Sequence, residues 1–396
     1  MEPVRNEALP LTADAVVIGA GMVGAAIAAA LAATGRRVLV VDRSGPLGGT
    51  TAGGEGNILV SDKLPGPELT LALRSVALWR ERAAELGGFE FEAKGGVVVA
   101  HDQAQLALLL ELGERQRAAG VEVRPLDPDG LRAAEPRIAP GLAGGAFYPQ
   151  DSQVQPMKAA LAFLSRARHD GARVVGGADV LALERGAGGE VAALVTSQGR
   201  VTAPVVVNAA GPWSGEVANR LGTPVPVWPR RGRILVTEPL PAGVIGHKVY
   251  EADYVGAVAS DSAALQCSAV VEGTASGTVL IGSSRDAAGF SAAPDPAALA
   301  EMARRAVGLF PFLAAVRAIR SYTGFRPASP DHLPVIGPDA EVPGLFHATG
   351  HEGAGIGLAP ATAELITALV AGTTPAVDPA PFAPGRFAKE VIADAH

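Results

Sequence analysis

Six residues near the N-terminus have the types and spacing of a dinucleotide-binding turn. They read Gly19-Ala-Gly-Met-Val-Gly24 and follow the apolar, β-branched run 14–18. Gly19 allows a tight turn, Gly21 lets the backbone approach a pyrophosphate, and Gly24 permits a helix to pack closely on a strand. Backbone N–H groups at the start of that helix then face the phosphate charge. The spacing therefore predicts that a dinucleotide binds here.

The residues around this turn fit the same prediction. The alanine-rich run 25–33 favours a helix, and 37–42 is a second apolar strand. Asp42 ends that strand, 18 residues after Gly24. A carboxylate there accepts hydrogen bonds from a ribose 2′-hydroxyl and repels a 2′-phosphate. The strand–helix–strand unit does not by itself separate FAD from NAD.

Further segments decide between the two cofactors. They are Gly48–Asn57, Val205–Ser214, Gly324–Pro327 with Asp331–Gly337, and Ala348–Pro360. Together with the glycine turn, and over nearly the whole chain, they resemble the D-amino-acid-oxidase-like FAD enzymes, the glycine and sarcosine oxidase group. A finer resemblance, to the FAD subunits of D-hydroxyproline or opine dehydrogenases, rests on residues 53–57 and 250–260.

This resemblance implies an α/β fold in which a Rossmann-like FAD-binding domain is interleaved with a mixed α+β substrate domain. We expect residues 1–88, 151–223 and 325–396 in the FAD-binding domain, and 89–150 and 224–324 in the substrate-binding domain. The apolar periodicity predicts helices over 68–87, 103–118, 156–168, 294–309 and 356–371. It predicts strands over 95–101, 205–208, 234–237, 254–258, 264–271, 279–281 and 345–348.

The resemblance also assigns residues to FAD. They are Gly19, Gly21, Met22, Val23 and Gly24 at the pyrophosphate, Asp42 at the ribose, Arg43 and Val180 near the adenine, Thr50, Thr51, Glu55, Gly56 and Asn57 along the pyrophosphate and flavin, and Gly353, Ala354, Gly355, Ile356 and Gly357 at the flavin C2 carbonyl and N1. The last group has a physical reason, because the start of a helix stabilises the negative charge of a reduced flavin. We expect FAD to be non-covalent, since Cys267 does not match the flavin-linking cysteine of sarcosine oxidases.

Three residues are candidates for the substrate side of the site. Arg326 stands in a Gly-x-Arg-Pro setting that holds a substrate carboxylate in glycine-oxidase-like enzymes, and a guanidinium suits that task. Tyr254 could bind the same carboxylate, and His351 could lie beside the flavin. Glu55 is unusual, because a carboxylate near a reduced flavin is electrostatically unfavourable. We expect Lys248 and its neighbour His247 at the surface.

The implied reaction is hydride transfer from the Cα of a small amino acid or derivative to flavin N5, which gives an imine. The substrates that fit are D-hydroxyproline, proline, opines, sarcosine and D-amino acids. Three alternatives stay open: an FAD subunit that passes electrons to a partner dehydrogenase subunit, with FMN possible at their contact; an NAD(P)H-dependent flavin hydroxylase; and a flavin-bearing structural subunit. The sequence names neither the electron acceptor nor the oligomeric state.

Composition narrows the setting of the protein. A net charge of −7 at pH 7 argues against nucleic-acid binding. Cys267 is the single cysteine, so a disulfide or a cysteine-ligated metal site within the chain is excluded, and a cytoplasmic location without a metal is expected. The start of the chain lacks the apolar core of a signal peptide, and the apolar run 356–370 is short for a membrane span. We therefore expect no transmembrane segment.

Overall fold

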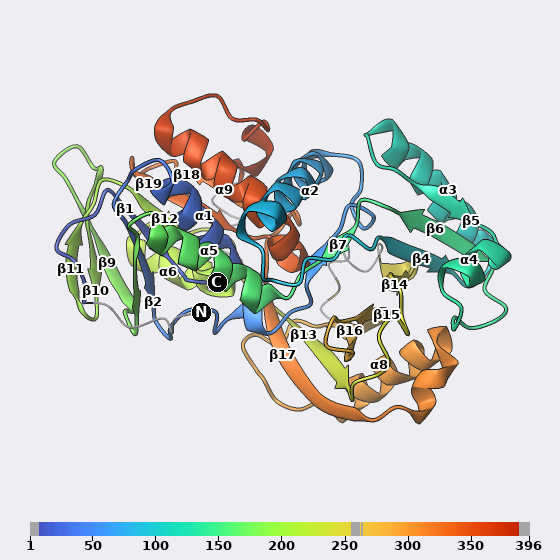
Figure 1. The fold of residues 1–396 in the computed structure, drawn as a ribbon. Coiled ribbons are helices and arrows are strands. Elements are labelled where there is room, and N and C mark those ends of the chain that lie inside the picture. Colours follow the sequence, from blue (N-terminus) through green and yellow to red (C-terminus); the bar gives the residue numbers. More distant parts are fainter. Residues whose placement is uncertain (1–7, 255–261, 263, 388–396) are drawn as a thin grey trace.

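The structure is a computed structural model that describes residues 8–254, 262 and 264–387. Two large β-sheets form its framework, with helices packed on both (Figure 1). In that view the first sheet lies to the left and the second to the right. The chain passes between them several times, so each sheet is assembled from segments that are far apart in the sequence.

The first sheet has six strands in the order β18-β19-β12-β1-β2-β8. These are β1 (Ala15–Ile18), β2 (Val38–Asp42), β8 (Arg173–Gly176), β12 (Val206–Asn208), β18 (Val335–Pro338) and β19 (Leu345–Thr349). All neighbours are parallel except β18 and β19. The central strands are buried on both faces, which explains why they are continuous runs of apolar residues rather than alternating ones.

Helices cover one face of the first sheet. They are α1 (Met22–Ala32), which packs on α5 (Pro156–His169) and α9 (Gly355–Ala371), and α2 (Pro67–Leu86), which packs on α9. The alanine-rich α1 is buried nearly all round, and its small side chains let three helices approach closely. A separate apolar cluster joins β1 and β2 to a small antiparallel sheet and to helix α6 (Ser214–Leu221). The small sheet consists of β9 (Val180–Arg185), β10 (Val191–Thr196) and β11 (Gly199–Thr202).

The second sheet has eight strands in the order β17-β13-β16-β15-β14-β4-β6-β5. These are β4 (Gly96–Ala100), β5 (Arg124–Leu126), β6 (Gly144–Tyr148), β13 (Trp228–Thr237), β14 (Lys248–Glu251), β15 (Gln266–Gly273), β16 (Val279–Arg285) and β17 (Ala318–Ala328). Helix α8 (Pro296–Leu309) packs on β15 and β16, while α3 (Gln103–Ala118) and α4 (Pro128–Ala134) pack on β4 and β6. Val97 and Val99 of β4 pack in the cluster of α4 and α8 and Val98 in the cluster of α3, so helices pack on both faces of this sheet.

Two close backbone approaches hold the loop after β2 in place. A Cβ on Gly324 in β17 would lie 2.2 Å from the carbonyl oxygen of Gly53, so glycine is required at this contact. A Cβ on Gly56 would lie 1.7 Å from the carbonyl oxygen of Val154, beside the short ribbon of β3 (Asn57–Ile58) and β7 (Ser152–Gln153). The loop after β2 is thereby fixed against the second sheet.

Most of the predicted helices agree with the structure, and α3 has the predicted bounds. Strand β17 was not predicted. Tyr254 lies in a helical turn rather than a strand, and most of the predicted strand 254–258 falls outside the described residues. The two-domain division stays a prediction, and β17 runs across its boundary at 324/325.

The expectation that the last apolar run is too short to span a membrane was wrong. Together with the turn before it, this helical segment covers Glu352–Ala371, 20 residues with a mean hydropathy of 1.6, and half of it is buried. By length and composition it could cross a membrane. A buried helix in a protein core can have the same length and composition. Helix α9 packs like such a core helix, because it contacts α1 and α2.

Candidate active site

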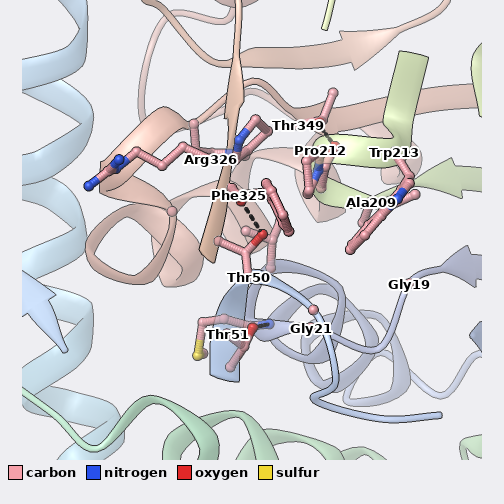
Figure 2. Close-up of a pocket in the computed structure, with 18 of the residues that line it drawn as sticks. Gly19, Gly21, Thr50, Thr51, Ala209, Pro212, Trp213, Phe325, Arg326 and Thr349 are labelled. Carbon is pink, nitrogen blue, oxygen red and sulfur yellow. Dashed lines mark hydrogen bonds between the residues drawn. The ribbon is translucent and has the colours of Figure 1, made fainter. Parts of the chain in front are cut away.

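A cavity of about 330 Å³ lies where the two sheets meet. Its walls come from the first turn of α1, the loop after β2, the loop after β12, strand β17 and the start of α9 (Figure 2). Of the residues predicted to bind FAD or substrate, most line it: Gly19, Gly21, Met22, Val23, Asp42, Arg43, Thr50, Thr51, Tyr254, Glu55, Asn57, Val180, Arg326, His351, Gly353, Gly355 and Ile356. The fold thus gathers these residues around one space.

The start of α1 forms one wall of the cavity. Gly19 has φ +103°, and a Cβ there would lie 2.4 Å from the carbonyl oxygen of Ala209. Gly24 does not line the cavity, because a Cβ on it would meet the carbonyl oxygen of Gly19 at 2.0 Å. Both glycines therefore bring backbone close to backbone, and the N–H groups of the first helical turn face the cavity.

Two threonines hold this wall in place. The Met22 N–H donates to the Thr51 hydroxyl at 2.9 Å, and the Thr50 hydroxyl donates to the Phe325 carbonyl oxygen at 2.6 Å. Figure 2 shows Thr50 and Phe325 facing each other across the cavity wall. The pair therefore ties the loop after β2 both to α1 and to β17, the strand that carries Arg326.

Asp42 organises the turn beside the predicted ribose position. Its Oδ2 accepts the Ala20 N–H at 2.9 Å, and its Oδ1 accepts the N–H groups of Ser44 and Gly45, each at 2.9 Å. A carboxylate offers about four acceptor positions, so capacity for a hydroxyl donor remains. Next to it, the Arg43 guanidinium stacks on the indole of Trp213 at 4.5 Å.

The start of α9 forms the opposite wall. Gly353 and Gly355 line the cavity there, and no side chain caps the helix start. Ala354 and Gly357 face a small adjoining hollow with Lys63 instead. Gly56 also stays outside the cavity, because it packs on Val154. This wall is mostly backbone, which suits a planar group with hydrogen-bond acceptors along its edge.

His351 lines the cavity as an uncharged side chain. Its imidazole is 3% exposed, and Nε2 lies 3.0 Å from the Thr362 hydroxyl oxygen. Burial lowers the pKa of His351 to about 3. His351 therefore adds no positive charge to the site at neutral pH.

Arg326 lies at the end of the cavity away from Trp213, and Figure 2 shows its side chain extending in that direction. Its Nη1 donates to the carbonyl oxygen of Ser284 at 3.0 Å, and Gly232 makes room for the guanidinium. No carboxylate among the described residues pairs with it. Burial and the charge of Arg285 lower the pKa of Arg326 from its usual value.

Tyr254 lies beside this arginine end of the cavity. It is 6% exposed and meets the ring of Tyr250 edge-on at 5.2 Å. The Arg285 guanidinium lies 5.0 Å from the centre of the Tyr254 ring. The tyrosine therefore contributes to the wall, and its ring is fixed by two neighbours.

The structure corrects the expectation for Lys248 and answers the question raised by Glu55. Lys248 is 2% exposed, and its Nζ lies 3.0 Å from Glu55 Oε2 and 2.8 Å from Glu272 Oε2. Burial would lower the pKa of Lys248, but the two carboxylates outweigh it and raise that pKa. Glu55 thus carries its own counter-ion. His247 is also partly buried, with Nδ1 2.8 Å from Glu135.

Sequence reasoning missed several residues that line the cavity. Trp213 and Phe325 were quoted as parts of motifs but given no role, and Phe290 connects them by stacking on Trp213 at 5.1 Å and meeting Phe325 edge-on. Glu352 was also missed. It accepts from Arg230 at 2.8 Å and, although burial opposes this, His332, Arg285 and Arg230 lower its pKa to about 2. Its place directly before the glycines of α9 was the available signal.

Comparison with known proteins agrees with this geometry. Residues 14–369 match the family described as FAD dependent oxidoreductase. The chain is 30% identical to the hydrogen cyanide synthase subunit HcnC of Pseudomonas aeruginosa, over 96% of this chain and 98% of that protein. It is also 30% identical to the glycine oxidase of Pseudomonas putida, over 95% of this chain and 100% of that protein.

Solved structures show the same fold over nearly the full length. Glycine oxidase from Geobacillus kaustophilus superimposes with a TM-score of 0.86 at 26% identity, covering 96% of this chain and 100% of that one. L-proline dehydrogenase from P. horikoshii superimposes with a TM-score of 0.87 at 25% identity, covering 96% of this chain and 98% of that one. The match over residues 14–369 and the two relatives at 30% identity show that the chain belongs to the FAD-dependent oxidoreductases of the glycine oxidase type.

Proposed function

We propose that the protein oxidises the carbon–nitrogen bond of a small amino acid or amino-acid derivative to an imine. The observation that carries this proposal is Arg326, a cation that reaches the end of the cavity and hydrogen-bonds to backbone carbonyls without a carboxylate partner among the described residues. An unpaired guanidinium at this position suits a carboxylate supplied by the substrate.

The residues of the chain would hold FAD along the cavity. The first turn of α1 with Thr51 suits the pyrophosphate, Asp42 and Arg43 suit the ribose and adenine, and the start of α9 suits the flavin edge. When bound, FAD would supply the two-electron chemistry, as acceptor of a hydride from the substrate Cα while the C=N bond forms. The amine gives up its proton to water.

The protein contributes position and electrostatics to this reaction. Arg326 would fix the substrate carboxylate and so orient the Cα. The neutral His351 and the paired Glu55 avoid placing an isolated charge beside the reacting atoms. We propose Tyr254 as a second contact for the carboxylate, because its ring lines the same end of the cavity as Arg326.

A second candidate is that the chain is one subunit of a larger amino-acid or opine dehydrogenase and passes electrons to a partner. It is favoured by the relative HcnC, which is itself named as a synthase subunit. A partner contact with FMN and a cytoplasmic location both stay predictions. A purified chain that is reduced by substrate yet turns over only with a co-encoded subunit would support this version.

An anaerobic screen tests the proposal. The FAD-loaded protein is mixed without oxygen with proline, hydroxyproline, sarcosine, D-amino acids and opines, and the loss of oxidised-flavin absorbance is followed. We expect at least one amine to bleach the flavin, and NADH and NADPH to leave it unchanged. Bleaching by a nicotinamide alone would support a hydroxylase and contradict the proposal.

A further inference from the structure

One residue of the cavity wall, Glu352, combines an unusual backbone conformation with an engaged side chain. Its φ is +45°, in the left-handed region that glycine adopts more readily than other residues. It lies between His351 and Gly353 and, like both of them, lines the cavity. A glycine at this position would relieve the backbone strain. A carboxylate retained in this conformation points to a task that glycine cannot perform.

Two other segments of the chain hold this carboxylate. Arg230, on β13, lies with Nη1 2.8 Å from Glu352 Oε1, and both side chains are less than a tenth exposed. His332, in the loop between β17 and β18, lies with Nδ1 3.2 Å from Glu352 Oε2 and itself has φ +59°. Two strained residues are thus joined through their side chains. The turn before α9 is therefore fixed to both neighbouring segments through the carboxylate of Glu352.

This ion pair lies beside the arginine that we propose for the substrate carboxylate. Arg230 is the cross-strand partner of Arg326 in the pairing of β13 with β17, so the two side chains leave the same face of the sheet. On the other side of Arg326, a Cβ on Gly353 would lie 3.6 Å from its Nε. The pair of Arg230 and Glu352 therefore lies where the wall at the start of α9 meets the substrate end of the cavity.

Glu352 is negatively charged at neutral pH, and Arg230 balances that charge. Burial raises the pKa of Glu352, but His332, Arg285 and Arg230 outweigh burial and lower that pKa to about 2. A carboxylate without a counter-ion at the flavin edge would oppose the negative charge that a flavin gains on two-electron reduction. The Arg230 guanidinium offsets this opposition. The ion pair thus fixes the turn without leaving a net charge from these two side chains.

We propose that Arg230 and Glu352 act as a charge-balanced pair that sets the reduction potential of the bound flavin. The inference rests on the proposed function, because it requires the flavin edge at the start of α9. Each member moves the potential in its own direction, since the carboxylate disfavours the reduced flavin and the guanidinium favours it. If the pair only held the turn in place, loss of either member would withdraw the helix start from the flavin and lower the potential.

The midpoint potentials of single-charge variants test this pair. They are measured on the FAD-loaded protein without oxygen, against redox dyes and without any amine. In Glu352→Gln, which keeps the volume, we expect the equilibrium to shift at least tenfold toward reduced flavin, which is about 30 mV for a two-electron couple. In Arg230→Met we expect a shift of similar size toward oxidised flavin. Arg230→Met/Glu352→Gln should return close to the potential of the unaltered protein.

Two further variants serve as controls. Glu364→Gln removes a carboxylate from the same helix, where it pairs with Arg74 and is 32% exposed, and it should leave the potential unchanged. Arg230→Lys keeps the charge and should keep the potential of the unaltered protein. FAD content and melting temperature are recorded for every variant. Should Arg230→Met not fold, the sign of the shift in Glu352→Gln decides, because loss of the charge raises the potential and loss of the positioned turn lowers it.

Three results would overturn this inference: shifts of the same sign in both single variants, an unchanged or lowered potential in Glu352→Gln, or a double variant that differs from the unaltered protein as much as either single one. If an amine bleaches the flavin while Glu352→Gln leaves the potential unchanged, the proposed function stands and the inference fails. Opposite shifts in a protein that no amine bleaches give the reverse.

Discussion

Replacing Lys248 with methionine would leave two buried carboxylates without their counter-ion. The ammonium lies 3.0 Å from Glu55 and 2.8 Å from Glu272, and the three side chains are 2%, 9% and 2% exposed. Removing one partner of such a buried ion pair costs about 3–5 kcal/mol of unfolding free energy. Methionine fills a similar volume, so we expect this loss to be mainly electrostatic.

The loss should depend on pH in a defined direction. Burial already raises the pKa of Glu272, and without the charge of Lys248 that pKa rises further. A carboxyl group whose pKa is raised in the folded state adds to the stability of the protein below its unfolded-state pKa. That contribution is lost as the pH rises through its folded-state pKa. Lys248→Met should therefore be less destabilising at about pH 5.5 than at about pH 8.

Urea unfolding of the FAD-loaded protein at both pH values measures this. Lys158→Met is the control, because Lys158 is 46% exposed and pairs with Glu90 at the surface, where an ion pair is worth under about 1 kcal/mol. Lys248→Met/Glu272→Gln should recover part of the loss, since it removes one unpaired charge. A loss below about 1 kcal/mol, or an equal loss at both pH values, would refute the role of Lys248 as the buried counter-ion of these carboxylates.

Three other predictions concern the cavity. Arg326→Met should lower the affinity for a carboxylate inhibitor by about tenfold to a hundredfold while FAD stays bound. A titration that follows the flavin spectrum measures this affinity, and an unchanged value would show that Arg326 does not bind the substrate. Gly19→Ala should abolish tight FAD binding, because its φ is +103° and Ala209 leaves no room; calorimetry with FAD should show that loss, and retained affinity would contradict it. His351 should contribute stability that is complete above pH 6.5 and is lost as pH falls toward its folded pKa of about 3, at up to about 1.4 kcal/mol per pH unit. That slope should be absent in His351→Gln, and an identical slope would mean that His351 is not buried as described.

The local features of this chain could be predicted because they depend on nearby residues. The glycine turn, Asp42 and the amphipathic run that forms α3 carry their own signals within a few residues of each other. The start of α9 was predicted within one residue, at 356 against Gly355, because the apolar run that follows the glycines indicates a helix.

The parts that could not be predicted depend on distant residues. Lysine is almost never buried unless it is paired, and the partner of Lys248, Glu55, lies 193 positions away in the sequence. Strand β17 was not predicted; it lies at the edge of its sheet, where Pro327 is tolerated.

The most direct measurement is a crystal structure of the FAD-loaded protein with a bound carboxylate inhibitor. We expect the pyrophosphate at the first turn of α1, the flavin edge at the start of α9, and the inhibitor carboxylate within hydrogen-bonding distance of the Arg326 guanidinium. An inhibitor carboxylate held elsewhere, with Arg326 still bound to backbone carbonyls alone, would contradict this expectation.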